Sequence, residues 1–238
     1  MIIIDGRQLR GVIFDMDGLM FDTESVYTIT WPIAAKRFGY EVTRDVVEGA
    51  IGLNAEDGRR YFEAAYGEDF PFYDIRKERL KIAMDYVCEN GLKVKKGLYN
   101  LIGFLKSEHI KRAVATSSER WRADKYLSMS RLEDSFEAVV CGDEVRNGKP
   151  MPDIFLTAAQ RIGVNIRECA VFEDSFNGIR AAHASGALAY MVPDCRQPDE
   201  EIASILDQKF DDLDQAEKYM RAHLIPQPGS IRQTENNG

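Results

Sequence analysis

The chain carries no block of basic residues, and its formal net charge is −8 over 238 residues. Nucleic acids and anionic membranes both attract clustered Lys and Arg, so neither is expected as a partner. No apolar run approaches the roughly 20 residues that a membrane-spanning helix needs. The apolar Ile2-Ile3-Ile4 is followed at once by Asp5, so we expect no signal peptide. These absences predict a cytoplasmic protein.

Cysteine is scarce, and its spacing does not favour metal binding. The four cysteines, Cys88, Cys141, Cys169 and Cys195, contain no CxxC pair. Cys141 and Cys169 lie in or beside apolar runs, which is typical of reduced core residues. Disulfides and a cysteine metal cluster are therefore disfavoured, in keeping with a cytosolic location.

The most informative motif is Asp15-Met16-Asp17-Gly18, which directly follows the apolar residues 11–14. A short apolar run that stops at a carboxylate is typical of a buried parallel strand, with Asp15 at its carboxyl end. Gly18 then allows a sharp turn. Two carboxylates at the mouth of a buried sheet need compensation, for which a divalent cation is suited. A calcium loop is disfavoured because the third acidic or amide residue and the later Glu of that pattern are missing.

Short apolar runs alternate with helical patterns along most of the chain. This alternation predicts an α/β fold with a doubly wound, Rossmann-like parallel sheet. The apolar runs are residues 11–14, 112–115, 138–141, 169–172 and 187–192, and the helical patterns between the last four are residues 120–129, 154–162 and 179–184, with 98–105 before them.

The long segment between the first two apolar runs has no clear strand pattern. It contains helical patterns that Gly39, Gly67 and Gly91 separate. We therefore expect an inserted all-helical cap domain whose entry and exit lie side by side, with Asp22 as a helix cap or a hinge residue at its start. The predicted division is a core of residues 1–20 and 95–225, a cap of residues 21–94, and a polar, disordered tail of residues 226–238.

Other strands of the predicted sheet also end in polar residues. Thr116-Ser117-Ser118 follows the second run and Glu173-Asp174 follows the fourth, while Lys149 lies between Gly148 and Pro150 before a helix. A parallel sheet gathers its carboxyl ends on one rim, so these side chains should meet Asp15 and Asp17. Carboxylates, hydroxyls and a lysine on one rim favour phosphoryl transfer with Mg²⁺.

With these motifs in order, the sequence resembles the haloacid dehalogenase-like hydrolases, in the helical-cap branch that includes β-phosphoglucomutases and sugar-phosphate phosphatases. Asp15-x-Asp17-Gly18-x-x-x-Asp22 is similar to the first motif of that family, Thr116 to the second, Lys149 to the third, and Glu173-Asp174 to the fourth. The resemblance covers roughly residues 10–215 and implies the same α/β core and cap.

The resemblance also implies a role for each carboxylate. Asp15 would be the nucleophile that forms an aspartyl-phosphate, and Asp17 the general acid and base. Mg²⁺ would be bound by Asp15, the backbone carbonyl of Asp17, and Asp174, with Glu173 in support.

The remaining motif residues would bind the phosphoryl group. Thr116, the backbone N–H of Ser117 and the ammonium of Lys149 would contact its oxygens. The Lys149 charge would also reduce the repulsion between Asp15 and the phosphate. A single hydroxyl or lysine is more often a helix cap or a surface group. The prediction of a phosphate-binding role therefore depends on the occurrence of all these residues together.

The cap residues discriminate between reactions. The related mutases carry a His in the first cap helix, where this chain has Tyr27, and a Lys and an Arg around a cap loop, where we align Ile51 and Ala55. A mutase must hold a second phosphate with such basic groups, so their absence favours hydrolysis. The acidic residue Asp17 disfavours dehalogenase and phosphonate-cleaving activity.

We therefore predict a monomeric, Mg²⁺-dependent phosphatase of small phosphorylated metabolites, with sugar phosphates foremost. The alternatives are a β-phosphoglucomutase-type phosphosugar mutase and, more remotely, a non-catalytic metabolite-binding domain. The loop 51–54 is expected to influence specificity. The cluster at residues 76–79 is interpreted as a solvated helix face, with Lys77 or Arg79 reaching the substrate as the alternative.

Overall fold

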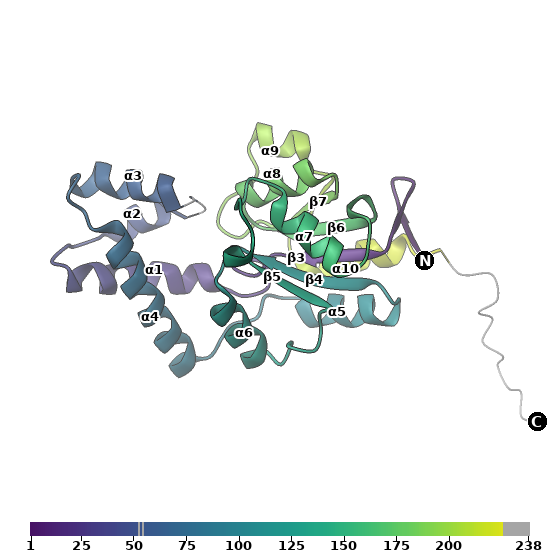
Figure 1. Cartoon of the computed structure of the whole chain (residues 1–238), viewed down its shortest axis with the longest axis horizontal. Helices are drawn as coiled ribbons and strands as arrows, with labels where there is room; N and C mark the ends of the chain where they lie inside the picture. Colours follow the sequence, from purple (N-terminus) through teal and green to yellow (C-terminus); the bar gives the residue numbers. More distant parts are fainter. Residues whose placement is uncertain (52, 54, 226–238) are drawn as a thin grey trace, which may run out of the picture.

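A six-stranded parallel sheet lies at the centre of the computed structural model, which describes residues 1–51, 53 and 55–225 (Figure 1). The strand order is β5-β4-β3-β6-β7-β8. The bounds are β3 Gly11–Phe14, β4 Lys111–Thr116, β5 Ala138–Cys141, β6 Cys169–Glu173, β7 Leu188–Met191 and β8 Gln208–Lys209. Because the sheet is wholly parallel, the carboxyl ends of β3, β4 and β6 share one rim.

Helices cover both faces of this sheet, so its central strands are apolar throughout. Val12 and Phe14 point into one core cluster with α5, α6 and α10, and Ile13 points into a second cluster with α7 and α8. The bounds are α5 Leu98–Ser107, α6 Arg120–Met129, α7 Asp153–Arg161, α8 Phe176–Ser185, α9 Glu200–Ile205 and α10 Leu213–Ala222. The predicted doubly wound α/β class is confirmed.

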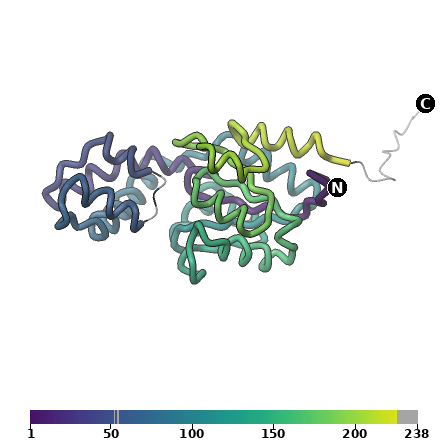
Figure 2. Tube along the Cα trace, turned by 90° about the horizontal axis from the view of Figure 1, so that it is seen from above, coloured from purple at the N-terminus to yellow at the C-terminus, as the bar shows by residue number. Residues whose placement is uncertain are grey.

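A separate helical layer lies to one side of the sheet, and Figure 2 shows it from above. It contains α1 Thr23–Arg37, α2 Arg44–Gly49, α3 Ala55–Tyr66 and α4 Phe72–Asn90. Aromatic side chains form its core, where the rings of Trp31 and Phe62 stack with centroids 4.3 Å apart and Phe70 and Phe72 pack beside them. The predicted all-helical cap is therefore present after the first core strand.

The two crossings between the cap and the core lie side by side. Phe21 and Val94 form an antiparallel bridge. The backbone N–H of Asp22 donates to the carbonyl of Lys93 at 2.9 Å, and that of Lys95 donates to the carbonyl of Met20 at 2.9 Å. The Asp22 side chain caps α1 by accepting from the backbone N–H of Ser25. These contacts agree with the expected paired crossings, while the domain boundaries themselves stay a prediction.

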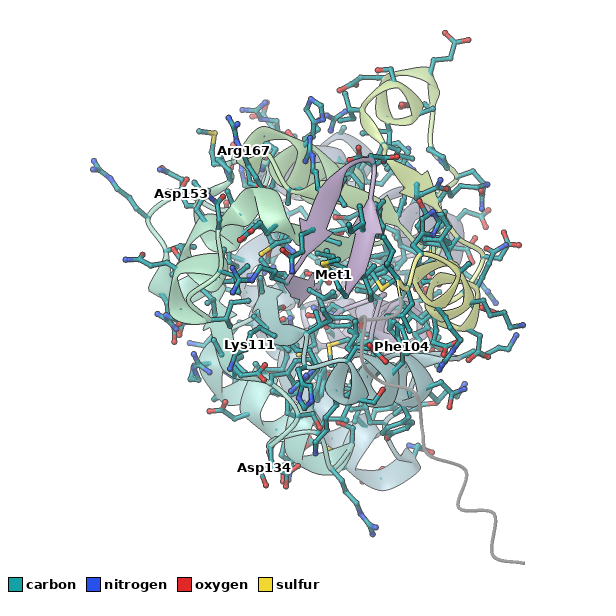
Figure 3. The ribbon with its side chains drawn as sticks, turned by 90° about the vertical axis from the view of Figure 1, so that its right-hand side faces the viewer. Met1, Phe104, Lys111, Asp134, Asp153 and Arg167 are labelled. Atoms are coloured by element: carbon teal, nitrogen blue, oxygen red, sulfur yellow. The ribbon has the colours of Figure 1, made fainter. Side chains whose placement is uncertain are left out.

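Short peripheral elements were not expected from the sequence. A hairpin of β1 Ile2–Ile4 and β2 Arg7–Leu9 lies at the N-terminal end, which faces the viewer in Figure 3. Ile2 also bridges to Leu224 after α10. Strands of two or three residues are too short for a periodic pattern, which is why the hairpin and β8 escape prediction. The expected disordered tail lies outside the described residues, and no helix among those described is long and apolar enough to cross a membrane.

Candidate active site

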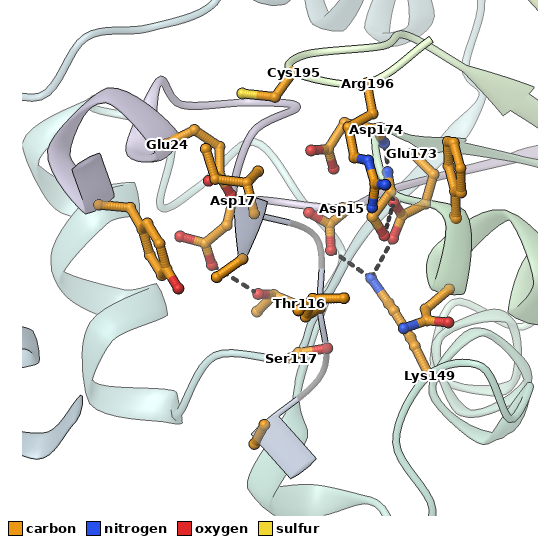
Figure 4. Close-up of a pocket in the computed structure, with 18 of the residues that line it drawn as sticks. Asp15, Asp17, Glu24, Thr116, Ser117, Lys149, Glu173, Asp174, Cys195 and Arg196 are labelled. Carbon is orange, nitrogen blue, oxygen red and sulfur yellow. Dashed lines mark hydrogen bonds and ion pairs between the residues drawn. The ribbon is translucent and has the colours of Figure 1, made fainter. Parts of the chain in front are cut away.

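The carboxyl ends of the central strands open into a cavity of about 410 Å³ between the core and the cap. Figure 4 shows the side chains that converge there. Every residue predicted for the site lines this cavity, and these residues are Asp15, Asp17, Thr116, Ser117, Lys149, Glu173 and Asp174. The pairing of β3 with β4 and β6 brings their ends together, because Phe14 lies opposite both Val114 and Phe172.

Lys149 connects two of the carboxylates. Its ammonium donates to Asp15 Oδ1 and to Glu173 Oε1, the second at 2.6 Å, and it also donates to the carbonyl of Ala115 at 3.2 Å. The side chains of Lys149, Asp15 and Glu173 are only 6%, 8% and 1% exposed. A charge buried this deeply needs its partners, so these groups form one electrostatic unit.

Glu173 is also tied to the start of α8. Its Oε2 accepts from the backbone N–H groups of Asp174 and Ser175, at 2.9 and 2.8 Å, and from the Ser175 hydroxyl at 2.9 Å. A Cβ at Gly178 would lie 1.8 Å from Glu173 Oε1. Only glycine at position 178 therefore leaves room for this carboxylate.

Asp17 lies on the other side of the cavity, against the end of β4. Its Oδ2 accepts from the hydroxyl of Ser118, from that of Thr116 at 3.4 Å, and from Arg122 Nη2 at 3.2 Å. The Arg122 guanidinium also contacts the Ser118 hydroxyl. Ser118 belongs to the hydroxyl cluster expected at this rim, although no role was assigned to it, whereas Arg122 was not predicted for the site. Arg122 lies in the first turn of α6, which begins shortly after the strand end that carries Ser118, and this proximity is the signal that could have identified it.

The buried carboxylates carry more negative charge than Lys149 can compensate. Burial raises the pKa of Asp15 to about 8; Lys149 opposes this rise, whereas Glu173 and Asp17 add to it. Burial, Glu173 and Asp15 raise the pKa of Asp174 well above its ordinary value. For Lys149, burial alone would lower the pKa, but the ion pairs with Asp15 and Glu173 outweigh it and raise the pKa. A second cation would relieve this excess.

The donor set suits a hard divalent cation. Carboxylate oxygens of Asp15, Glu173 and Asp174 all lie within 4.8 Å of one another. Oxygen-only ligands at the mouth of a sheet match the preference of Mg²⁺. The side chain of Asp17 is not in this cluster, and the contribution of its backbone carbonyl stays a prediction. The residues present therefore fit a divalent metal.

Comparison with known proteins decides the family. The family model for haloacid dehalogenase-like hydrolases matches residues 12–192. The chain belongs to this family. A phosphorylated carbohydrates phosphatase from Thermotoga maritima is 34% identical over 178 residues, which cover 75% of this chain and 82% of that protein. A β-phosphoglucomutase from Bacillus subtilis is 31% identical over 192 residues, covering 77% of this chain and 83% of that protein.

A solved structure agrees with this assignment. The crystal structure of CbbY from Rhodobacter sphaeroides in complex with phosphate matches with a TM-score of 0.75 at 22% identity, covering 87% of this chain and 96% of that one. That likeness shows a shared fold. As a haloacid dehalogenase-like hydrolase, the chain is an enzyme, and the resemblance inferred from its motifs is confirmed.

The cap of this haloacid dehalogenase-like hydrolase lines the opposite side of the cavity, and sequence patterns did not single out its residue Glu24. Glu24 from α1 and Arg76 from α4 line the cavity, as do Tyr27 and Ile51. Arg79 is only 8% exposed, so the interpretation of residues 76–79 as a solvated face is wrong at this position. Its guanidinium lies 4.7 Å from the centroid of the Tyr27 ring. A charged cluster on an amphipathic helix gives no indication of which member turns inward.

The loop predicted to influence specificity is described only in part. Ile51 and Leu53 line the cavity. Gly52 and Asn54 lie outside the described residues. The role of this loop in specificity stays a prediction.

Proposed function

We propose that this chain is a Mg²⁺-dependent phosphatase that hydrolyses small phosphorylated metabolites, with sugar phosphates as the main class, through an aspartyl-phosphate at Asp15. The observation that carries the proposal is the convergence of Asp15, Lys149, Glu173 and Asp174 in one buried unit, with Asp17 facing the same cavity. The similarity to a phosphorylated carbohydrates phosphatase supports the substrate class. The cytoplasmic location and the monomeric state are further proposals.

The first chemical step transfers the phosphoryl group to the protein. A carboxylate oxygen of Asp15 attacks phosphorus while the bond from phosphorus to the alcohol oxygen breaks. The Asp17 carboxyl group gives its proton to the departing oxygen, so the product leaves as a neutral alcohol. Lys149, already paired with Asp15, contacts the phosphoryl oxygens and offsets the approach of two negative groups.

The second step returns the protein to its starting state. Asp17, now a carboxylate, accepts a proton from water as that water attacks phosphorus. The bond between phosphorus and the Asp15 oxygen breaks, which releases inorganic phosphate and leaves Asp17 protonated again. Thr116 and Ser117 keep the phosphoryl group oriented through both steps. For this, the Thr116 hydroxyl must exchange its contact with Asp17 for one with the phosphate.

Asp15, Asp174, Glu173 and the backbone carbonyl of Asp17 would bind Mg²⁺ or support its ligands. The cation supplies charge that stabilises the phosphoryl group as its bonds change. Cap residues close the cavity from the other side, which limits access by water and by folded phosphoproteins.

A mutase is the second candidate, and one observation favours it. Arg76 extends from the cap to the cavity, where a basic group could hold the distal phosphate of a bisphosphate. Against it, Ile51 and Ala55, which we align with basic residues of the mutases, line the cavity with apolar side chains, and Tyr27, which we align with the mutase His, lines it as well. The balance favours hydrolysis.

Phosphate release from a panel of small esters with Mg²⁺, including β-glucose 1-phosphate, separates the two candidates. We expect the wild-type protein to release inorganic phosphate from several sugar phosphates. Conversion of β-glucose 1-phosphate into glucose 6-phosphate with a bisphosphate primer, without release from any ester, would establish the mutase instead.

Substitution at Gly18 tests the proposed metal site. Gly18 has φ +84°, and a Cβ there would lie 2.2 Å from Asp174 Oδ2. Gly18→Ala is therefore expected to displace Asp174 and to weaken Mg²⁺ binding by at least about tenfold, with the Kd for Mg²⁺ obtained from the dependence of Tm on Mg²⁺ concentration. Gly39→Ala is the matched control, since Gly39 has φ +85° with nothing within 4 Å of its added Cβ. Equal Kd values for Mg²⁺ in the two variants would contradict the assignment of Asp174.

A further inference from the structure

Two side chains of the first cap helix face the cavity from one turn of α1. Glu24 and Tyr27 are three residues apart, so they lie on the same side of the helix, and both line the cavity. Figure 4 shows Glu24 on the same side of the cavity as Asp17, across from Lys149. The alcohol portion of a bound ester must extend from the phosphate toward Asp17 and the cap. This is the side of the cavity on which Glu24 lies.

Glu24 has an oxygen whose hydrogen-bonding capacity is unused. Among the described residues its Oε2 is buried and has no hydrogen-bond partner. Burial, together with the charges of Asp17 and Asp194, raises the pKa of this carboxyl to about 7, and Arg79 and Lys95 only partly oppose the rise. A buried acceptor without a donor is unfavourable, and folded proteins rarely retain one without a reason. An acidic residue in the first turn of a helix can also stabilise the helix dipole. That role would not require the Glu24 carboxylate to be buried.

Tyr27 complements this acceptor. Burial raises the pKa of its phenol to about 12, so the phenol remains a neutral hydrogen-bond donor at physiological pH. The buried Arg79 guanidinium lies 4.7 Å from the centroid of the Tyr27 ring, and this cation–π contact restricts the orientation of the ring. An aromatic ring next to a carboxylate offers an apolar surface and an acceptor together. Sugars present both C–H surfaces and hydroxyl donors, so they match this pair.

We propose that Glu24, supported by Tyr27, selects phosphate esters of polyhydroxylated alcohols by accepting hydrogen bonds from hydroxyl groups of the leaving alcohol. This inference rests on the proposed phosphatase function and narrows its substrate class. Esters without additional hydroxyls lose the contact entirely.

The test compares two esters that need the same protonation of the leaving group. One is the sugar phosphate that the wild type hydrolyses best, and the other is n-butyl phosphate, whose alcohol has no further hydroxyl. Removal of Glu24 also alters the charge beside Asp17, and this change affects the hydrolysis of both esters alike. A loss confined to the sugar phosphate therefore reports on the hydroxyl contact alone. The variants are Glu24→Ala, Glu24→Gln and the control Glu41→Gln, an exposed cap carboxylate. Thermal melts establish that each variant is folded.

Glu24→Ala is expected to lower kcat/KM for the sugar phosphate by about 10- to 100-fold and that for n-butyl phosphate by no more than about threefold. Glu24→Gln keeps an acceptor oxygen, so its loss should be smaller than that of Glu24→Ala, and Glu41→Gln should match the wild type. An equal loss for both esters, or no loss for the sugar phosphate, would overturn the role of Glu24. If the wild type releases phosphate from neither ester nor from any other, the proposed function itself fails, and the inference fails with it.

Discussion

Asp15→Asn protein is expected to release phosphate at least about 10⁴-fold more slowly than the wild type, with the loss in kcat. Asparagine has nearly the same shape as aspartate, but its amide does not act as a nucleophile toward phosphorus. The amide oxygen can still accept from Lys149, which in the native protein donates to Asp15 Oδ1. Because one excess negative charge is removed from a crowded, buried cluster, the variant should remain folded. Steady-state phosphate release and a thermal melt check both expectations.

The control for this substitution is Asp124→Asn, an exposed carboxylate on α6. It makes the same chemical change outside the site and should leave kcat within about twofold of the wild type. If Asp15→Asn retained a rate within tenfold of the wild type, the nucleophile would have to be another group.

Lys149→Met should give the largest combined effect on stability and activity. Methionine fills a similar volume but leaves Asp15 and Glu173 buried without their shared cation. Breaking a buried ion pair by removing one partner costs about 3–5 kcal/mol, so we expect a decrease of this size in the free energy of unfolding without Mg²⁺. The phosphoryl group also loses a positively charged contact, and kcat should fall by roughly 10²- to 10³-fold.

Added Mg²⁺ separates this explanation from a simple packing defect. A divalent cation bound by Asp15 and Asp174 would compensate part of the lost charge, so the stability difference should narrow as Mg²⁺ is added. The control is Lys125→Met at an exposed position of α6, which should change neither quantity measurably. Equal stability of Lys149→Met and wild type in the absence of Mg²⁺ would show that Lys149 does not compensate the buried carboxylates.

The core of the fold was accessible from the sequence because its signals are strong and redundant. Apolar runs such as that before Asp15 are long enough to specify buried strands, and Gly18 marks the turn that follows. A parallel sheet then dictates that residues at strand ends, such as Thr116 and Glu173, share one rim. The predicted site residues consequently line one cavity, although their catalytic roles remain proposals.

The cap residues that line the cavity could not be predicted from sequence motifs in this way. Glu24 looked like any acidic residue in the first turn of a helix, and Arg79 like any residue of a charged cluster. The burial of Arg79 and of the Glu24 Oε2 atom depends on how α1 and α4 pack against each other and against the core, which no local pattern encodes. Substrate selection depends on these packing contacts, so the sequence motifs predict the reaction better than the substrate.

The most direct test of the central claim is to trap the phosphoryl group on Asp15. Asp17→Asn protein is mixed with p-nitrophenyl phosphate and Mg²⁺, because this leaving group needs no acid while the second step still needs the missing base. Acid quenching followed by borohydride reduces an acyl-phosphate to an alcohol, so peptide mass spectrometry should find homoserine at position 15 and nowhere else. Homoserine at another position, or none despite a burst of p-nitrophenolate, would contradict the proposed aspartyl-phosphate.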